Sequence, residues 1–274
     1  MIDAIFQYKF LQNALIAGIF ASIVCGVIGV IIVEKRLVMM SGGIAHTSYG
    51  GVGFGYLLNF EPIIGAFIFS VIAALGIGYI KRKGGTRSDV VIGLFWSVGM
   101  ALGIVFISLM PGYPPELDSY LFGNILSVTS SDLKLIAIFT IIVLLVIIIL
   151  FNDWKAYLFD DEFSTIIGLK TAFMEYLLLI LIAMTVVALI RVVGIILVIA
   201  LLSAPAAISG LFTSKLKNQM ILSVILGCIF CILGLWLSYL TDISSGAAIV
   251  ILSGFAYLVA YAVKRLLSLK LNRA

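Results

Sequence analysis

The chain has 274 residues, of which 63% are apolar and only 11% are charged, and its mean hydropathy is +1.27. A soluble domain needs about 25% charged residues to cover its surface, so this composition excludes an ordinary water-soluble protein. The net charge of +4 does not indicate nucleic-acid binding, because the basic residues lie between apolar runs rather than among aromatics on a polar face.

Long apolar runs predict helices that cross a lipid bilayer. Leu135–Phe151 and Ile243–Val263 carry no charge, and each approaches the roughly 20 residues that a helix needs to cross about 30 Å of hydrocarbon. No cleavable signal peptide is expected, because the first run is longer than a signal core. The sequence therefore predicts an all-α integral membrane protein, one domain over residues 1–274, with eight or nine transmembrane helices. The expected spans are residues 11–33, 44–60, 62–80, 89–109, 133–151, 173–190, 192–212, 220–240 and 246–264.

The loop charges predict an orientation. If the end of the first span is cytoplasmic, 14 of the 17 Lys and Arg residues lie on the cytoplasmic side, and only Lys9, Lys134 and Arg191 lie outside. Cytoplasmic loops of membrane proteins carry an excess of Lys and Arg. We therefore expect the N-terminus outside and the C-terminus in the cytoplasm.

His46, the only histidine, stands in the sequence SGGIAHTSYGG. If the helix continues from the cytoplasmic pair Lys35–Arg36, this residue lies about 15 Å into the membrane, whereas a helix starting near Ile44 would leave it shallower. An ionisable group within the membrane is a functional hypothesis, and imidazole is a common ligand of transition metals. A histidine that is hydrogen-bonded to a neighbouring helix is an equal alternative at this point.

Two connections are long enough to form structure of their own. Residues 111–132, on the outside, contain the apolar stretch Tyr120–Leu126, which favours a short amphipathic or re-entrant piece. Residues 152–172, on the inside, are too polar to span. There we expect a short surface helix with Asp160–Glu162 at its start, where acidic residues favour the helix dipole.

Other motifs limit the chemistry. The chain contains no Gly-rich phosphate loop and no HExxH, so we expect it not to be an enzyme on its own. Cys228 and Cys231 are one helical turn apart, but packing is favoured over a shared metal. Pro205 interrupts the seventh span and predicts a helix break there, either as a packing kink or as a freed carbonyl lining a cavity.

Several segments resemble the permease subunits of the zinc/manganese/iron family of bacterial ABC importers, with the zinc-uptake permeases most alike. The resemblance covers nearly the whole chain, in seven pieces that occur in the family's order. They are NALIAGIFASIVCGVIG, MSGGIAHTSYGGVGFGYLL, SDVVIGLFWSVGMALGIVFISL, LDSYLFGNILSVTSSDL, DDEFSTIIGLK, VGIILVIALLSAPAAISG and DISSGAAIVILSG.

The resemblance implies a vitamin-importer-like permease fold in a prokaryotic plasma membrane. Its implied partners are a second permease copy, two cytoplasmic ABC ATPase subunits and an extracytoplasmic metal-binding protein. It makes the segment Asp160–Leu169 the coupling helix to the ATPase, with Asp161, Glu162 and Gly168 as coupling residues. It also makes His46 a transient metal ligand on the path of a transported ion, with no permanently bound cofactor.

The chain departs from the family's pattern at Gly42. Many members have an aspartate there, four residues before the histidine. The turn Asp242, Ser244 and Gly246 also differs from the family's DxPxG-like turn. Because Gly42 removes an oxygen ligand, the sequence favours Zn²⁺ as cargo over the alternatives Mn²⁺ and Fe²⁺.

A more distant alternative is a stand-alone secondary metal transporter. A proton-driven carrier usually places carboxylates within its spans. Glu175 and Asp89 are expected only at cytoplasmic ends of spans, so the importer subunit is the preferred interpretation.

Overall fold

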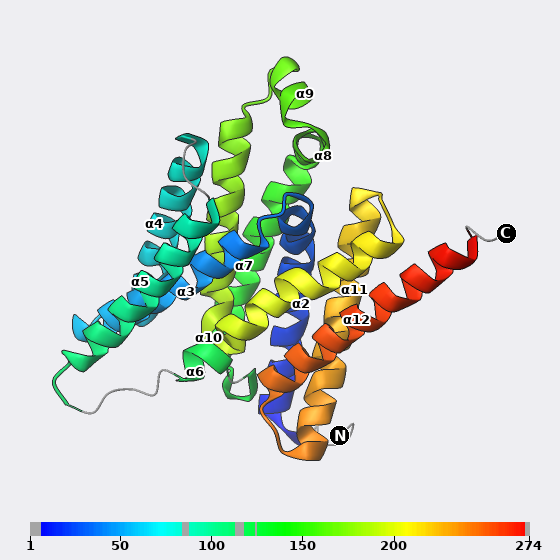
Figure 1. Cartoon of the computed structure of the whole chain (residues 1–274). Coiled ribbons are helices and arrows are strands. Elements are labelled where there is room, and N and C mark those ends of the chain that lie inside the picture. The colour runs from blue at the N-terminus through cyan, green and yellow to red at the C-terminus, as the bar shows by residue number, and fades with distance from the viewer. Residues whose placement is uncertain (1–6, 84–87, 113–117, 124, 272–274) are drawn as a thin grey trace.

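The computed structural model describes residues 7–83, 88–112, 118–123 and 125–271, and within these ranges the regular structure is entirely helical. The elements, in chain order in Figure 1, are α2 (Lys9–Glu34), α3 (Val38–Leu57), α4 (Pro62–Lys83), α5 (Ser88–Ser108), α6 (Asp118–Phe122), η1 (Ile125–Ser127), α7 (Ser130–Ile149), α8 (Phe151–Phe159), α9 (Asp161–Ile166), α10 (Thr171–Phe212), α11 (Leu216–Thr241) and α12 (Ser245–Leu271).

The helices correspond to the nine expected spans. In the described part of the chain, seven helices are long and apolar enough to cross a membrane: α2, α4, α5, α7, α10, α11 and α12. One of them, α10, has 42 residues and would be about 63 Å long if straight, twice the hydrocarbon thickness, so it supplies two spans. The remaining span is α3, whose glycines and polar residues lower its hydropathy but whose side chains are mostly buried within the protein.

The break in α10 lies at Gly194 and not at Pro205. Gly194 has φ +78° and ψ 160°, whereas Pro205 lies inside continuous helix. Because a proline ring holds φ near the helical value, Pro205 remains in the helix with the loss of one backbone hydrogen bond. Glycine can adopt the conformation at residue 194, which other residues rarely reach. In Figure 1 the two halves of α10 diverge from a bend beside α6.

Close backbone contact explains why the bend is there. Gly123, just after α6, has φ +70°, and a Cβ atom on either Gly123 or Gly194 would overlap the backbone of the other segment. In the segment Tyr120–Leu126, expected to form a short amphipathic or re-entrant piece, the described residues belong to α6, Gly123 and η1, and both α6 and η1 pack against α10.

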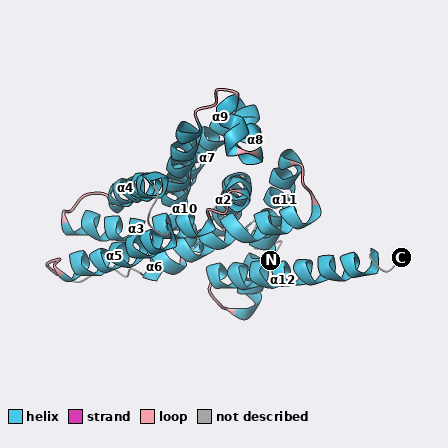
Figure 2. Cartoon of the chain, turned by 45° about the horizontal axis from the view of Figure 1, so that its top comes forward, coloured by secondary structure: helices cyan, strands magenta, loops and turns pink. Residues whose placement is uncertain are grey.

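The spans form two groups around α10. On one side, α3 packs extensively against both α4 and α5; on the other, α2 packs against α10 and α11. These groups lie on either side of α10 in Figure 2. The core therefore sits around α2, α3 and α10, while α5, α7 and α12 expose most of their apolar surface, as helices facing lipid do.

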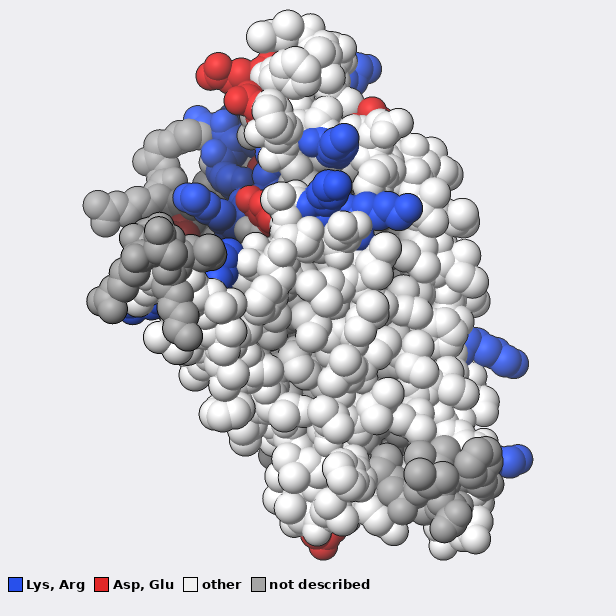
Figure 3. All heavy atoms as spheres, turned by 90° about the vertical axis from the view of Figure 1, so that its right-hand side faces the viewer, with Lys and Arg blue, Asp and Glu red and all other residues white. Residues whose placement is uncertain are grey.

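The inner connection forms two helices, α8 and α9, rather than one. It is followed by Gly168, which has φ +84°. Figure 3 shows that Lys and Arg side chains concentrate towards the end of the molecule that carries α8 and α9. We call this end, which also holds the α2–α3 and α10–α11 connections, the basic end.

Candidate metal site and coupling surface

Glycines bring α3 and α5 together at the level of the histidine. A Cβ on Gly50 would lie 2.6 Å from the carbonyl oxygen of Gly99, and a Cβ on Gly53 would lie 2.6 Å from that of Gly103. Such contacts are possible only between glycine backbones, and small residues are what allow helices to approach closely in lipid. The approach places the side chains of α5 directly beside those of α3.

His46 lies against Trp96 of α5. The ring centroids are 3.9 Å apart and the planes are inclined by 12°. The histidine is buried, and its Nδ1 atom has no hydrogen-bond partner. Since α3 begins at Val38, six residues before the expected start, His46 lies about 12 Å along the helix.

The same indole covers Gly42. A Cβ on Gly42 would lie 3.3 Å from Cζ3 of Trp96 and 3.9 Å from Cδ1 of Ile199. Gly42 and His46 are one turn apart on α3, so the aromatic ring of Trp96 lies against both. The Cβ of an aspartate at position 42 would therefore require the indole to shift by a few tenths of an ångström.

One copy of the chain does not provide a complete metal site in its described residues, where no three His, Cys, Asp or Glu side chains are grouped to hold an ion. The three cysteines are free thiols, of which Cys25 and Cys231 are buried and Cys228 is partly buried. Cys231 Sγ lies 3.4 Å from the hydroxyl of Ser22, a contact between α11 and α2. The arrangement agrees with a packing role for Cys231.

At the basic end, Asp160 starts α9. Its Oδ1 accepts hydrogen bonds from the backbone N–H groups of Glu162 (2.7 Å) and Phe163 (2.9 Å). This is an N-cap, the reason that the acidic run begins a helix. Asp161 is the first helical residue, and its side chain lies outside the described residues.

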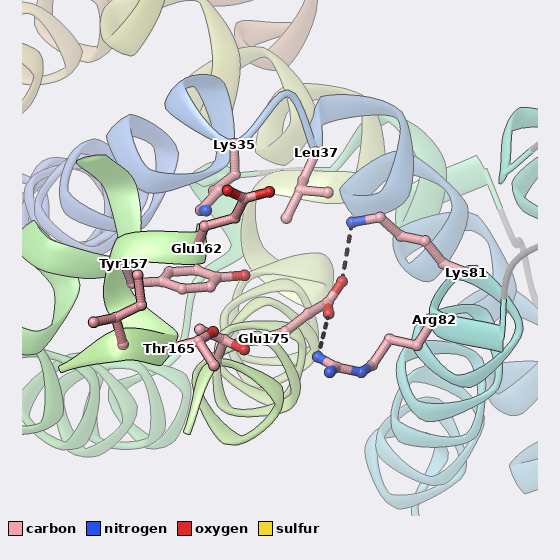
Figure 4. Close-up of a pocket in the computed structure, with 10 residues that line it drawn as sticks. Lys35, Leu37, Lys81, Arg82, Tyr157, Glu162, Thr165 and Glu175 are labelled. Atoms are coloured by element: carbon pink, nitrogen blue, oxygen red, sulfur yellow. Dashed lines mark hydrogen bonds and ion pairs between the residues drawn. The ribbon is translucent and has the colours of Figure 1, made fainter. Parts of the chain in front are cut away.

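A cavity of about 670 Å³ separates α9 from the ends of the membrane helices. Figure 4 shows Glu162 on its α9 side and Glu175, at the start of α10, facing the end of α4. The carboxylate of Glu175 is buried and pairs with Lys81 Nζ (2.9 Å) and Arg82 Nη1 (3.0 Å). The helix that follows the α8–α9 segment is thereby tied to α4, which packs against the histidine-bearing α3.

The tip of the basic end exposes large apolar side chains. Phe159 is 82% exposed and Ile166 is 83% exposed, with Phe163 half exposed between them. Exposed apolar patches beside polar residues are typical of surfaces that contact another protein or a membrane. Together with the cavity, these side chains form what we call the coupling surface: Phe159, Glu162, Phe163, Ile166 and Gly168.

At the opposite end, Arg191 joins two other segments. Its guanidinium lies 3.3 Å from a carboxylate oxygen of Glu61 and 3.6 Å from one of Asp132. Asp132 also closes a capping box with Thr129 at the start of α7. The bend of α10 is thus fixed by ion pairs as well as by the glycine contact.

Sequence reasoning missed Trp96, the pairing of Glu175 and the role of Gly194. The sequence could have pointed to Glu175, because it is the only charged residue between Lys170 and Arg191. It pointed more weakly to Gly194, which stands in an otherwise β-branched and apolar stretch. No sequence pattern indicates Trp96, because its position depends on how α5 packs against α3.

Comparisons with known proteins match this chain over nearly its whole length. The ABC 3 transport family matches residues 7–264. An uncharacterized membrane protein of Synechocystis sp. is 43% identical, over 97% of this chain and 94% of that protein. The manganese transport system membrane protein MntC of Listeria monocytogenes is 36% identical, over 95% of this chain and 92% of that protein. The solved structure of PsaBC from Streptococcus pneumoniae in complex with Fab has a TM-score of 0.88 and 33% identity, covering 98% of both chains.

Proposed function

Because the chain belongs to the ABC 3 transport family, we propose that it is the membrane subunit of an ATP-driven importer of manganese. The observation that carries the choice of metal is the 36% identity, over nearly the whole chain, to a relative named as a manganese transport system membrane protein. The subunit forms the translocation path and leaves ATP hydrolysis to a partner.

The proposed assembly contains two copies of this chain, two cytoplasmic ABC ATPase subunits and an extracytoplasmic metal-binding protein, in a prokaryotic plasma membrane. The basic end faces the cytoplasm, with the N-terminus outside and the C-terminus inside. The charge asymmetry supports this orientation, because 14 of the 17 Lys and Arg residues belong to that side. The coupling surface then points towards the ATPase.

The metal passes His46 as a transient ligand. The support is a buried imidazole whose Nδ1 lacks a hydrogen-bond partner within a deeply placed, glycine-rich helix. Since the described residues of one copy offer no group of three ligands, a second copy facing the first would supply the second imidazole. A site with few protein ligands suits transport, because a closed four-ligand site would release its ion slowly.

Zinc is the second candidate cargo, and one observation favours it. Position 42 is glycine and is covered by Trp96, so the turn that carries His46 offers no carboxylate. Manganese prefers oxygen ligands, whereas zinc is well served by imidazole. The donor chemistry therefore favours zinc and the relatives favour manganese, and iron is a third candidate.

ATPase movement would reach the path through α9. Asp161, Glu162 and Gly168 lie in or next to this helix, and the ion pairs of Glu175 line the cavity behind Glu162. A shift of α9 relative to α10 would therefore be transmitted to α4 and from there to α3.

Co-expression and reconstitution test the proposal. The chain, expressed with an ABC ATPase encoded beside it, should purify as a complex with two copies of each subunit. In proteoliposomes that contain this complex and the binding protein, radioactive Mn²⁺ uptake should require ATP. Metal uptake by the isolated chain without ATP would instead support the secondary transporter.

A further inference from the structure

A second cavity at the basic end, of about 890 Å³, shares no lining residue with the cavity behind Glu162. It is bounded by the end of α2, by α8 and by the α10–α11 connection. Its size falls within the range of small-molecule sites, which is about 300–1,000 Å³. The polar side chains that line it include Glu34, Asn152, Lys155, Lys215 and Lys217.

The lining of this cavity is net positive, because three lysines face one carboxylate. Lys155, Lys215 and Lys217 form no ion pair with any residue that the structure describes. The one acidic lining residue, Glu34, is held by the amide of Gln219, which donates a hydrogen bond to its Oε1 at 2.8 Å. The N-terminus of α11, which carries the positive end of the helix dipole, also lies at this cavity. No acidic residue in the first turn of α11 offsets that positive potential.

The walls around the lysines are apolar and continue along the membrane. Phe151 and Leu158 of α8 line the cavity, and Phe159 and Phe163 of the coupling surface form its edge towards α9. Below it, α7 and α11 both pack against α2 and flank it. The outer faces of both helices are exposed and apolar: Ile141, Leu145 and Ile148 on α7, and Ile221, Ile225 and Ile232 on α11.

We propose that this cavity binds the phosphate headgroup of an anionic phospholipid from the leaflet at the basic end, with the acyl chains along the exposed faces of α7 and α11. Basic pockets between transmembrane helices suit such headgroups. A lipid explains both halves of the site, since its phosphate pairs with the lysines and its chains cover the apolar helices. The site is independent of the transported metal and of His46.

Lipid retention by the purified full-length chain tests the proposal. The chain, exchanged into detergent with phosphatidylglycerol or phosphatidylcholine, is examined by native mass spectrometry. The wild type should retain phosphatidylglycerol preferentially. In K215Q/K217Q, the affinity for phosphatidylglycerol should fall about fivefold for each lysine removed, while retention of phosphatidylcholine stays unchanged.

The matched control is K264Q/R265Q, which removes the same charge from the exposed part of α12 outside the cavity. The control should retain phosphatidylglycerol as the wild type does. An equal loss in the control would show general attraction to a basic surface and overturn the assigned site. A photoactivatable phosphatidylglycerol should label residues 210–217 in the wild type, and label found only elsewhere would also overturn it.

Two further results would exclude a lipid. Displacement of the photoactivatable lipid by millimolar inorganic phosphate would indicate a site for a free anion. Unchanged lipid retention in K215Q/K217Q, combined with lost binding of the ATPase, would make the cavity a protein contact.

Discussion

The imidazole of His46 lies face to face with the indole of Trp96, with centroids 3.9 Å apart and planes inclined by 12°. The indole also lies against Gly42, one turn earlier on α3. A side chain at position 42 would therefore lie in tight contact with the ring at position 96.

An aspartate at position 42 should bind metal well only if the ring of Trp96 is also made smaller. We expect Gly42→Asp alone to bind Mn²⁺ weakly, because Trp96 occupies the space beside the histidine. The double variant Gly42→Asp/Trp96→Ala should bind it at least about tenfold more tightly than either single variant, a difference of about 1.4 kcal/mol. Calorimetric titration of the purified chain measures both. Equal affinities for Gly42→Asp and the double variant would show that the indole does not restrict the site.

The bend of α10 should tolerate only glycine. Gly194→Ala places a Cβ at φ +78° and against the backbone of Gly123, so we expect a loss of at least about 3 kcal/mol of stability. Gly93→Ala is the matched control, because Gly93 is helical and a Cβ added there would have no neighbouring atom within 4 Å. Thermal unfolding in detergent compares the two. Similar melting temperatures would contradict the role given to Gly194.

The ion pairs of Glu175 should matter more for transport than for stability. Glu175→Gln removes the charge that holds Lys81 and Arg82, whose side chains are 36% and 38% exposed. Because solvent screens the two cations, we expect a stability loss of only about 1 kcal/mol. ATP-driven uptake should fall several-fold while ATP hydrolysis continues. Unchanged uptake would show that transport does not require the ion pairs between α4 and α10.

The coupling surface should be separable from the membrane-embedded core. Glu162→Lys reverses a charge at the cavity, and Gly168→Val strains a residue with φ +84° that has open space around it. Both variants should insert and fold normally but lose metal uptake, with hydrolysis no longer linked to transport. Cysteine cross-links from Ile166, which is highly exposed, should reach the ATPase. If no such cross-links form in an assembled complex, this surface does not contact the ATPase and the coupling role proposed for it is wrong.

The sequence predicts the fold better than the site, for physical reasons. Apolar length predicts the spans other than the glycine-rich and more polar α3. The loop lysines and arginines predict the charged end that Figure 3 shows. The short helix after Asp160 follows from local capping. In contrast, Trp96 meets His46 only through the glycine contacts between α3 and α5, and Glu175 meets Lys81 across 94 residues of sequence. Pro205 was the expected break because proline is a strong local signal, but the bend at Gly194 depends on a contact with distant Gly123.

His46 should be required for transport and not for assembly. We expect His46→Ala to abolish metal uptake, because it removes the one imidazole of each copy, while the complex still forms and basal ATP hydrolysis survives. The alanine variant also loses the stacking on Trp96, so Trp96→Phe serves as a control that keeps an aromatic ring and the histidine. Uptake of radioactive Mn²⁺ into proteoliposomes, with and without competing Zn²⁺, measures both the role of His46 and the metal preference of the transporter. If the cargo is the metal named for the relatives, Mn²⁺ uptake should persist in an equal concentration of Zn²⁺. If the lack of a carboxylate at Gly42 decides the metal, Zn²⁺ should suppress Mn²⁺ uptake. Full uptake of either metal by His46→Ala would make this residue a packing histidine and would require the path to use other ligands.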